Sequence, residues 1–500
     1  MSGVSPKTDY FYIVEAADAV GNKTVDDSSG TCYAFTTDEG PRDIYVPTEY
    51  STIQEAIKRS WNGGTVWVSD GYYQGQGNRD IDFLGRAIIV SSENGPETCI
   101  IDCQGSRVNP HRGFYFHNGE GASSVLDGFA IINGYVNDEG GGIYCTASSP
   151  TIINCVFYGN YAQNWGGAIS NRGSSTTLTN CIFMANSTRW GGAVACCYCY
   201  KGPTLADCTF FDNSARHGGA LYNDHSRPTV TDCNFSSNSA TYGAGVYNFR
   251  GVYDVSLIGP KLHNCTFSAN SSSSLGGGMF NFESNPTVTN CEFTDNSSLH
   301  YAGAVYSSDG SNPIFDNCTF STNSAEYGGA IYCLGDSRAV FSKCSITGNS
   351  AQWNGGGVYG GLGQVRNCTI ADNDANIGGG LYGCNGLITN CIINGNIAVS
   401  RGGAFYSCNG PIIGCTITDN SGGGLDSCFG PIINCIIWNG DTGSSAGDPV
   451  LSGSSVPLYS CVQGGSDGIG CIGVDPCFID AQNGDYHLLP NSPCKDSGNY

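Results

Sequence analysis

The sequence predicts an all-β protein: a single-stranded right-handed parallel β-helix, a solenoid, with a short N-terminal capping helix. Two phrases recur between residues 140 and 440. One is glycine-rich, as in Gly166-Gly167-Ala168-Ile169, and the other ends in asparagine, as in Phe157-Tyr158-Gly159-Asn160. A repeat of roughly 20–50 residues indicates a solenoid or a propeller. No segment has the apolar spacing of an amphipathic helix, which excludes helical repeats.

A cysteine stands five residues before each recurring asparagine, and successive cysteines are 20 to 32 residues apart. The cysteine ladder comprises Cys155, Cys181, Cys208, Cys233, Cys265, Cys291, Cys318, Cys344, Cys368, Cys391, Cys415 and Cys435. The asparagine ladder comprises Asn160, Asn186, Asn213, Asn238, Asn270, Asn296, Asn323, Asn349, Asn373, Asn396 and Asn420. We expect the ladder cysteines to stack inside as small apolar residues and to stay reduced, because side chains in parallel register suit disulfide geometry poorly.

Each repeat contains three short β-type segments separated by Gly, Asn and Ser. Ile152 and Cys155 are three residues apart, so one straight strand cannot point both side chains inward. A left-handed bend at Asn154 resolves the conflict, because Asn tolerates that conformation. The same bend is expected at the equivalent residues Asn180, Asn264, Asn290 and Asn317. Three strands and three turns describe one coil of a β-helix, and the crossover rule makes it right-handed.

The chain divides into an N-terminal segment and the solenoid. Residues 1–40 contain two β-type stretches that resemble the last strands of a fibronectin type III or immunoglobulin-like domain. Two strands cannot stand alone, so we expect this chain to be a fragment of a larger multidomain protein; the alternative is that the hairpin pads the next domain. The solenoid takes residues 44–500: cap and irregular coils over 44–139, regular repeats over 140–440, and closing coils over 441–500.

A capping helix is predicted near residue 51. Ser51-Thr-Ile-Gln54 has the form of a capping box, and Ile53, Ala56 and Ile57 make one apolar face. Such a helix would cover the open end of the first coil, whose strand edges and core are otherwise exposed.

The formal charge is −22, with 21 basic and 43 acidic residues. This acidity argues against nucleic acid or an anionic membrane as a partner and favours cationic partners or divalent cations, calcium among them. We expect no other cofactor. No run of 18 apolar residues predicts a membrane span, and the polar first ten residues do not form a signal peptide.

Three segments carry a resemblance to known families. Residues 46–57, 64–68 and 71–73 resemble the N-terminal cap of pectin-lyase-like right-handed β-helix proteins. The Gly-Gly-Ala-Ile and Phe-x-x-Asn phrases resemble the repeats of polymorphic outer-membrane proteins, and residues 475–498 resemble the closing segment of secreted bacterial β-helix proteins. The resemblance implies a bacterial protein that is extracellular or displayed on the cell surface.

Some enzymes of this superfamily cleave acidic polysaccharides, with paired carboxylates, bound calcium or a basic residue. No segment gathers such groups, and none of the arginine-bearing motifs of pectate lyases is present, so no catalytic residue is assigned. The least regular repeat loop, Asn248 to Lys261, holds Arg250 and Asp254 and is the first place to look for a site.

Aromatic residues recur at two positions of the repeat. One position, just before the paired small residues, is held by Trp165, Trp190, His217, Tyr242, Tyr301 and Tyr327, with Arg189, Arg216 and Glu326 alongside. The other, which alternation places outside the coil, is held by Tyr144, Tyr222, Tyr247, Phe280, Tyr306, Tyr332, Tyr359, Tyr382 and Tyr406. Two roles are open for these aromatic lines. Stacked rings can stabilise adjacent coils, or exposed rings can bind a sugar or a protein, because a rigid ring loses little conformational entropy on binding.

We therefore expect a non-catalytic adhesion or glycan-binding protein, a monomeric rod that contacts a polysaccharide, a surface glycan or a protein. The alternatives are a lyase or hydrolase of an acidic polysaccharide and a structural stalk. Four cysteines outside the ladder, Cys461, Cys471, Cys477 and Cys494, are disulfide candidates in an exported protein.

Overall fold

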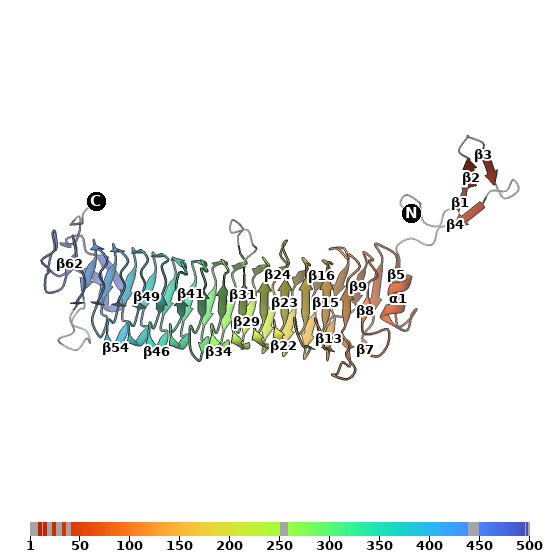
Figure 1. Ribbon diagram of the computed structural model, residues 1–500, viewed down its shortest axis with the longest axis horizontal. Helices are drawn as coiled ribbons and strands as arrows, with labels where there is room; N and C mark the ends of the chain where they lie inside the picture. The colour runs from red at the N-terminus through yellow and green to blue at the C-terminus, as the bar shows by residue number, and fades with distance from the viewer. Residues whose placement is uncertain are drawn as a thin grey trace.

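The computed structural model contains a rod of stacked β-coils that runs from orange at α1 and β5 to blue in Figure 1, which confirms the predicted parallel β-solenoid. The structure describes residues 9–12, 14–17, 23–26, 33–36, 42–250, 259–438, 450–495 and 497–498. One continuous set of parallel sheets runs through the regular repeats on both sides of the gap at 251–258.

Most regular coils have four strands rather than the three predicted. In one coil they are β16 (Thr151–Ile153), β17 (Val156–Tyr158), β18 (Tyr161–Ala162) and β19 (Ile169–Arg172), and we number the sheets 1 to 4 in this order. The extra strand, on sheet 3, is rich in Ser and Ala in many coils. These residues have low β-propensity, so the sequence pattern did not distinguish it from the turn before it.

Sheet 1 has 16 strands, one from each coil. Its strands are β5 (Asp43–Val46), β6 (Thr65–Val68), β9 (Ile89–Ser92), β12 (Val125–Asp127), β16, β20 (Thr177–Thr179), β24 (Thr204–Ala206), β28 (Thr229–Thr231), β32 (Lys261–His263), β36 (Thr287–Thr289), β40 (Ile314–Asp316), β44 (Val340–Ser342), β48 (Val365–Arg366), β52 (Ile388–Thr389), β56 (Ile412–Ile413) and β59 (Ile432–Ile433).

Sheet 2 also has 16 strands and carries the stacked phenylalanines of the core. Its strands are β7 (Gly71–Tyr73), β10 (Cys99–Asp102), β13 (Ala130–Ile132), β17, β21 (Ile182–Met184), β25 (Thr209–Phe211), β29 (Asn234–Ser236), β33 (Thr266–Ser268), β37 (Glu292–Thr294), β41 (Thr319–Ser321), β45 (Ser345–Thr347), β49 (Thr369–Ala371), β53 (Ile392–Asn394), β57 (Thr416–Thr418), β60 (Ile436–Trp438) and β62 (Cys461–Val462).

Sheet 3 has 11 strands and is confined to the regular repeats. Its strands are β14 (Tyr135–Val136), β18, β22 (Ser187–Trp190), β26 (Ser214–His217), β30 (Ser239–Tyr242), β34 (Ser271–Leu275), β38 (Ser297–Ser298), β42 (Ser324–Tyr327), β46 (Ser350–Asn354), β50 (Asp374–Ile377) and β54 (Ile397–Arg401).

Sheet 4 has 15 strands and closes each coil. Its strands are β8 (Ile81–Asp82), β11 (Phe114–Phe116), β15 (Ile143–Thr146), β19, β23 (Val194–Cys197), β27 (Leu221–Asp224), β31 (Val246–Phe249), β35 (Met279–Phe282), β39 (Val305–Ser308), β43 (Ile331–Cys333), β47 (Val358–Gly360), β51 (Leu381–Tyr382), β55 (Phe405–Tyr406), β58 (Leu425–Asp426) and β61 (Leu451–Ser452).

The capping helix α1 (Ile53–Arg59) is present, one residue later than the capping box predicted. Its N-cap is Thr52, whose hydroxyl accepts from the Glu55 N–H at 3.3 Å, because the chain turns into the helix after rather than at Ser51. The predicted apolar face is confirmed: Ile53, Ala56 and Ile57 are all fully buried. No helix in the described part of the chain is long and apolar enough to cross a membrane.

Short antiparallel strand pairs flank the solenoid in the sequence. In the N-terminal segment, β1 (Asp9–Tyr12) pairs with β4 (Tyr33–Thr36), and β2 (Val14–Ala17) pairs with β3 (Lys23–Asp26). Much of residues 1–40 lies outside the described residues, so the immunoglobulin-like assignment stays a prediction. Near the C-terminus, β63 (Phe478–Asp480) and β64 (Asp485–Leu488) pair across a turn of 3-10 helix, Ala481–Asn483.

The predicted left-handed bends are confirmed. Asn154, Asn180, Asn264, Asn290 and Asn317 have φ between 51° and 55°. Coils have three further left-handed positions, at Gly159, Gly166 and Gly173 in the coil of Asn154, so each of the four strands ends at such a residue. Asn and Gly recur at these points because they adopt the left-handed region at low cost.

At the second bend of each coil, backbone groups leave the sheets and lose their partners there. The side chains of the asparagine ladder supply the missing hydrogen bonds. Asn186 Oδ1 accepts from the backbone N–H and the Nδ2 of Asn160, at 3.0 and 3.1 Å. Asn186 Nδ2 donates to the carbonyl of Phe157 and to Asn213 Oδ1, both at 3.0 Å. The pattern repeats through Asn420, and every ladder asparagine is fully buried. Only an amide of this length both accepts and donates in this way.

The ladder cysteines are buried, as predicted, and the described cysteines are free in the structure. Their thiols are not merely apolar fillers. Cys155 Sγ donates to the carbonyl of Ile153 at 3.2 Å, and Cys233 Sγ accepts from the N–H of Cys208 at 3.4 Å. Burial also raises the pKa of the Cys155 thiol to about 12, so it stays protonated at neutral pH.

Replacing Asn238 by Ala should destabilise the rod by about 2–4 kcal/mol. The change leaves the Asn213 N–H and the Phe210 carbonyl without their partners inside the protein, and each unsatisfied buried group costs about 1–3 kcal/mol. Urea unfolding followed by circular dichroism measures the free energy of unfolding. The matched control is Asn234→Ala on the exposed face of β29, which should change it by less than about 0.5 kcal/mol. Equal effects of the two changes would contradict the role given to the ladder.

Candidate functional site

The predicted aromatic line lies along sheet 3, where the chain turns into sheet 4. Backbone pairing aligns Trp165 with Trp190, Trp190 with His217, and His217 with Tyr242. Leu275, which the sequence analysis did not include, then interrupts the line before Tyr301 and Tyr327. We call this line, together with the outward side chains of sheet 4 that it faces, the aromatic corner.

The rings of the line stack on one another along the rod. Ring centroids are 5.1 Å apart for Trp165 and Trp190, 6.2 Å for Trp190 and His217, and 5.0 Å for His217 and Tyr242. Tyr301 and Tyr327 stack at 5.4 Å. Interplanar angles of 16° to 23° make these near-parallel stacks, so successive rings cover one another's faces.

The second aromatic line, on sheet 4, points out of the coil as predicted, but most of it is buried. Tyr222, Tyr247, Phe280, Tyr306 and Tyr332 are only 4–7% exposed. They form a second apolar cluster against which the sheet 3 rings pack. His217, for example, meets Tyr247 edge-on at 5.3 Å and 89°.

The prediction of flat, exposed rings is therefore wrong in one respect. The sheet 3 rings are half-buried, with their faces against neighbouring rings and one edge against sheet 4. The physical reason is the coil spacing: side chains at one position of successive coils lie about one strand spacing, ~4.8 Å, apart, which is close to ring-stacking distance. What the corner offers to a ligand is ring edges and the polar side chains between them.

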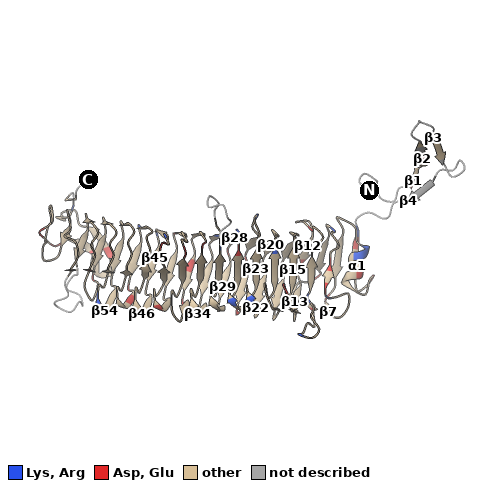
Figure 2. Cartoon of the chain, viewed as in Figure 1, with Lys and Arg blue, Asp and Glu red and all other residues tan. Residues whose placement is uncertain are grey.

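Two of the predicted polar residues lie together at the surface of the corner. Arg189 and Arg216 occupy adjacent positions on β22 and β26, just before Trp190 and His217, and both are exposed. Arg189 lies over the Trp190 ring, 4.2 Å from its centroid. Within the described part of the chain, neither guanidinium has a carboxylate within salt-bridge distance. Figure 2 shows basic positions beside β22 on a rod that is otherwise sparsely charged.

The third predicted polar residue, Glu326, lies further along the corner and has a partner. Its carboxylate meets His300 Nδ1 at 2.9 Å. The structure thus separates the predicted charged residues into an arginine pair and a paired acid several coils away.

His217 is influenced by both arginines. Burial first, and then the charges of Arg216 and Arg189, lower the pKa of His217 from 6.5 to about 4. The imidazole is therefore neutral at pH 7 and contributes a ring, not a charge, to the corner.

One ionisable residue of the corner was missed by the sequence analysis. Glu139 aligns with Trp165, one coil before the aromatic line, and its carboxylate is buried. It accepts from Ser170 Oγ at 3.1 Å and meets Arg172 Nη1 at 2.6 Å. Glu139 precedes Gly140-Gly141 as Trp165 precedes Gly166-Gly167, so extending the repeat one unit back could have found it.

Further ionisable residues gather next to this end of the corner. His111 Nδ1 meets Asp80 Oδ2 at 2.5 Å, and the other oxygen of Asp80 accepts from the Arg112 N–H at 3.0 Å. The Arg112 guanidinium lies 5.3 and 5.2 Å from the Tyr115 and Tyr144 ring centroids, and burial lowers its pKa. Asp80 and His111 line a cavity of about 820 Å³ beside α1, together with side chains that include Glu55, Lys58 and Arg79.

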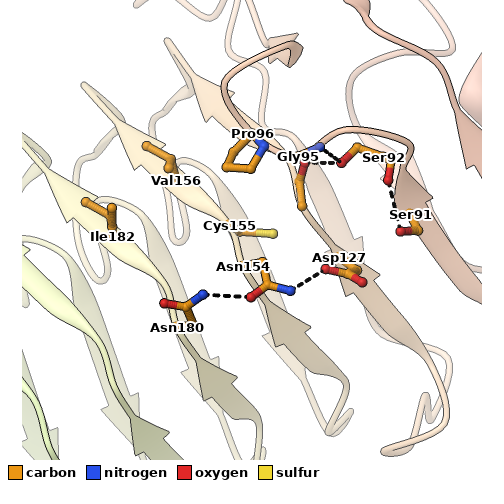
Figure 3. Close-up of a pocket in the computed structure, with 11 residues that line it drawn as sticks. Ser91, Ser92, Gly95, Pro96, Asp127, Asn154, Cys155, Val156, Asn180 and Ile182 are labelled. Carbon is orange, nitrogen blue, oxygen red and sulfur yellow. Dashed lines mark hydrogen bonds between the residues drawn. The ribbon is translucent and has the colours of Figure 1, made fainter.

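A smaller hollow of about 410 Å³ lies at the junction of sheets 1 and 2 (Figure 3). Asn180 Nδ2 donates to Asn154 Oδ1, and Asn154 Nδ2 donates to Asp127 Oδ1, both at 2.8 Å. These hydrogen bonds join three of the polar side chains of the hollow; Ser91 and Ser92 also line it, and Pro96, Val156 and Ile182 supply apolar lining.

Among the described residues, no three His, Cys, Asp or Glu side chains are grouped so as to hold a metal ion. Calcium therefore remains a prediction made from acidity. The loop from Asn248 to Lys261, predicted as the first place to look, lies mostly outside the described residues. Its ends separate: Arg250 pairs with Glu283 at 3.3 Å next to sheet 4, whereas Lys261 is on sheet 1.

The coils and the corner define a parallel β-solenoid protein with an extended lateral surface. The family model described as right handed beta helix region matches residues 86–259 and 248–361, which together take in more than half of the chain. The chain belongs to this family. The likeness of its repeats to those of polymorphic outer-membrane proteins stays a prediction.

The solved structures that the chain resembles are distant in sequence. The catalytic domain of a GH87 alpha-1,3-glucanase in complex with tetrasaccharides is 14% identical, with a TM-score of 0.30, and the match covers 85% of this chain and 69% of that one. A PL6 alginate lyase complex with trisaccharide is 12% identical, with a TM-score of 0.34 and 84% and 85% covered. The Yersinia enterocolitica family 28 exopolygalacturonase is 9% identical, with a TM-score of 0.25 and 91% and 85% covered. No curated protein matches the chain.

Replacing Trp190 by Ala should lower the free energy of unfolding by roughly 1–3 kcal/mol, because the half-buried ring packs against the second cluster and stacks on two neighbours. This corrects the near-neutral effect that an exposed platform would predict. The matched control is Trp353→Ala on β46. Trp353 stands one residue before Asn354, which pairs with Tyr327 of the line, and it is 44% exposed. It should change stability by less than about 0.5 kcal/mol in urea unfolding. A neutral Trp190→Ala would show that the ring does not support the corner.

His217 should make the protein less stable as the pH falls from 6.5 to 4. In the unfolded chain the imidazole takes up a proton near pH 6.5, whereas in the folded chain it does so only near pH 4. The unfolded state therefore binds more protons in this window, and the cost at its lower end stays below roughly 3 kcal/mol, because solvent screens the partly exposed ring. Denaturant unfolding of the wild type and of His217→Gln at several pH values measures this. The difference in unfolding free energy between them should shift by that amount; parallel profiles would contradict the assignment.

Proposed function

We propose that this protein binds an anionic polysaccharide along the aromatic corner without cleaving it. The observation that carries the proposal is the pair of exposed arginines, Arg189 and Arg216, stacked on adjacent coils with no carboxylate partner among the described residues. The chain has 43 acidic residues against 21 basic ones, so two neighbouring unpaired cations stand out.

The electrostatics of the pair favour an anionic ligand. Two like charges about 5 Å apart repel by roughly 1 kcal/mol in bulk water. A carboxylate or sulfate between the two guanidinium groups removes this repulsion and forms charge-assisted hydrogen bonds with both. Phosphates of nucleic acids carry the same chemistry, but the charge of −22 opposes long polyanions of high charge density.

The rings beside the arginines supply contact area for the sugar, whereas the arginines select for its acid groups. Trp190 is held by Trp165 on one side and His217 on the other, so it presents an edge and little open face. Sugar C–H groups can pack along this edge while Arg189, seated over the Trp190 ring, is held ready for the acid group. An extended polymer suits the site because the corner continues over several coils.

A second function has its own observation in favour. Asp80 and His111 line a cavity of about 820 Å³, with the backbone of Arg112 bonded to Asp80, and this is the kind of localised departure from the repeat that a depolymerase needs. In that case His111, oriented by Asp80, is the group placed to move a proton. The alternative is therefore an enzyme acting on the same anionic polysaccharide, and an extracellular or cell-surface location suits either function.

Replacing both Arg189 and Arg216 by Gln should weaken binding of a uronate polymer such as polygalacturonate roughly 10- to 100-fold, because two charge-assisted contacts are lost. Isothermal titration calorimetry measures the affinity. The methyl-esterified form of the same polymer, which lacks the carboxylates, should bind the wild type weakly.

The matched control is Arg366→Gln, an exposed arginine on sheet 1 away from the corner, which should leave the affinity unchanged. If neither polymer binds, or if the double variant binds as well as the wild type, the proposed site is wrong. New reducing ends or new unsaturated ends after incubation, lost in His111→Gln, would establish the enzymatic alternative instead.

A further inference from the structure

Cys461 departs from the pattern of the cysteine ladder. On β62, the last strand of sheet 2, it pairs with Ile436, and Val462 pairs with Ile437. Ile437 is fully buried in the core and Ile436 is on the opposite face of the strand, so register directs Cys461 out of the coil. The ladder position itself is taken by Ser460, whose hydroxyl accepts from the Cys435 N–H at 3.1 Å.

Cys461 is nevertheless only 3% exposed, because the end of the chain folds over it. Its backbone pairs with Ile472, and its thiol donates to the carbonyl of Val474 at 3.2 Å. Cys494 is brought to the same place, because Ser492, whose Oγ accepts from the Cys494 N–H, donates to the carbonyl of Pro476, two residues after Val474. Residues 472–474 therefore cover the outer face of the last strand at Cys461, and the closing segment that carries Cys494 follows directly.

Cys494 is held in place beside Cys461 by its own neighbours. Its N–H donates to Ser492 Oγ at 3.2 Å, and Ser492 Oγ donates to the carbonyl of Pro476 at 2.6 Å. Ser497 Oγ donates to the carbonyl of Cys494 at 3.0 Å. Cys494 is half-buried, so a small oxidant can reach it.

The two remaining cysteines outside the ladder have other contacts. Cys471 Sγ donates to the carbonyl of Pro457 at 3.1 Å, and Cys477 Sγ donates to the carbonyl of Asp475 at 3.4 Å. Of the four disulfide candidates, the structure thus brings together one pair. The ladder thiols are poor disulfide partners for one another. Their side chains all point the same way in parallel register, and they are buried in the core.

We propose that Cys461 and Cys494 form a disulfide when the protein meets a disulfide oxidant, and that this bond fastens residues 475–498 over the last coil. The pairing is independent of the polysaccharide site. It gives the C-terminal end of the solenoid a covalent closure, where a repeat protein otherwise exposes strand edges and core.

The chemistry is a thiol–disulfide exchange with a small-molecule disulfide such as oxidised glutathione. The hydrogen bond with Cys461 lowers the pKa of the Cys494 thiol, which favours its thiolate. This thiolate attacks one sulfur of the oxidant, and one glutathione thiolate leaves. Cys461 then gives up its proton and attacks the Cys494 sulfur, and the second glutathione leaves. Two protein thiols are oxidised, and one disulfide is reduced to two thiols.

The test is carried out on the full chain. Fully reduced protein is incubated with oxidised glutathione, free thiols are alkylated, and peptides are mapped by mass spectrometry without reduction. The expected result is one crosslinked peptide pair containing Cys461 and Cys494. Chymotrypsin should then cut between residues 463 and 493 roughly ten-fold more slowly in the oxidised protein than in the reduced one, because the bond limits local opening.

The matched variants separate this pair from the other candidates. Cys471→Ser with Cys477→Ser should keep both the crosslink and the protection, whereas Cys494→Ser should lose both and leave Cys461 alkylated only after unfolding. Cys494 found joined to Cys471 or Cys477, or left free, would overturn the pairing. A crosslink that leaves the cleavage rate unchanged would overturn the closure.

Discussion

The rod depends on how its bends satisfy the backbone. A left-handed residue stands at the end of the strands of each coil, and the amides at the second bend cannot join the sheets. The asparagine ladder takes their place: each side chain accepts from the coil before it and donates both back to that coil and on to the next, as Asn186 does between Asn160 and Asn213. Because every link needs the next coil, stability passes from neighbour to neighbour along the solenoid.

The same regularity governs where chemistry can occur. Inward positions are taken by stacked aliphatic residues, Phe, Cys and Asn, so ionisable side chains lie mainly on the outer faces and at the ends. In the aromatic corner, coil spacing forces like rings to stack, and the rings serve stability first. In the proposed site, binding selectivity falls to residues that break the pattern, Arg189 and Arg216, which have no carboxylate partner in the described part of the chain.

Position within the coil also divides the cysteines into two kinds. The thiol of Cys155 points inward, donates to the carbonyl of Ile153 and stays protonated at neutral pH. The thiol of Cys461 points outward on the last strand and meets another thiol from the closing segment. A shift of one residue along a strand turns a side chain from the inner to the outer face. That shift decides whether a cysteine is sealed in the core or can meet another thiol.

The sequence by itself determined the solenoid, its left-handed asparagines, its buried cysteines and the helix that caps its first coil, because these follow from a period, from φ preferences and from one apolar face. It also placed the aromatic line in one file, because equivalent residues of successive coils must align. Only the tertiary structure decided the rest. The strand on sheet 3 exists because neighbouring coils pair with it, although its Ser and Ala favour strands weakly. The burial of Tyr222 and its equivalents, the separation of Glu326 from the arginines, and the meeting of Cys461 with Cys494 depend on which faces the folded chain brings together. Local sequence carries no record of those distances.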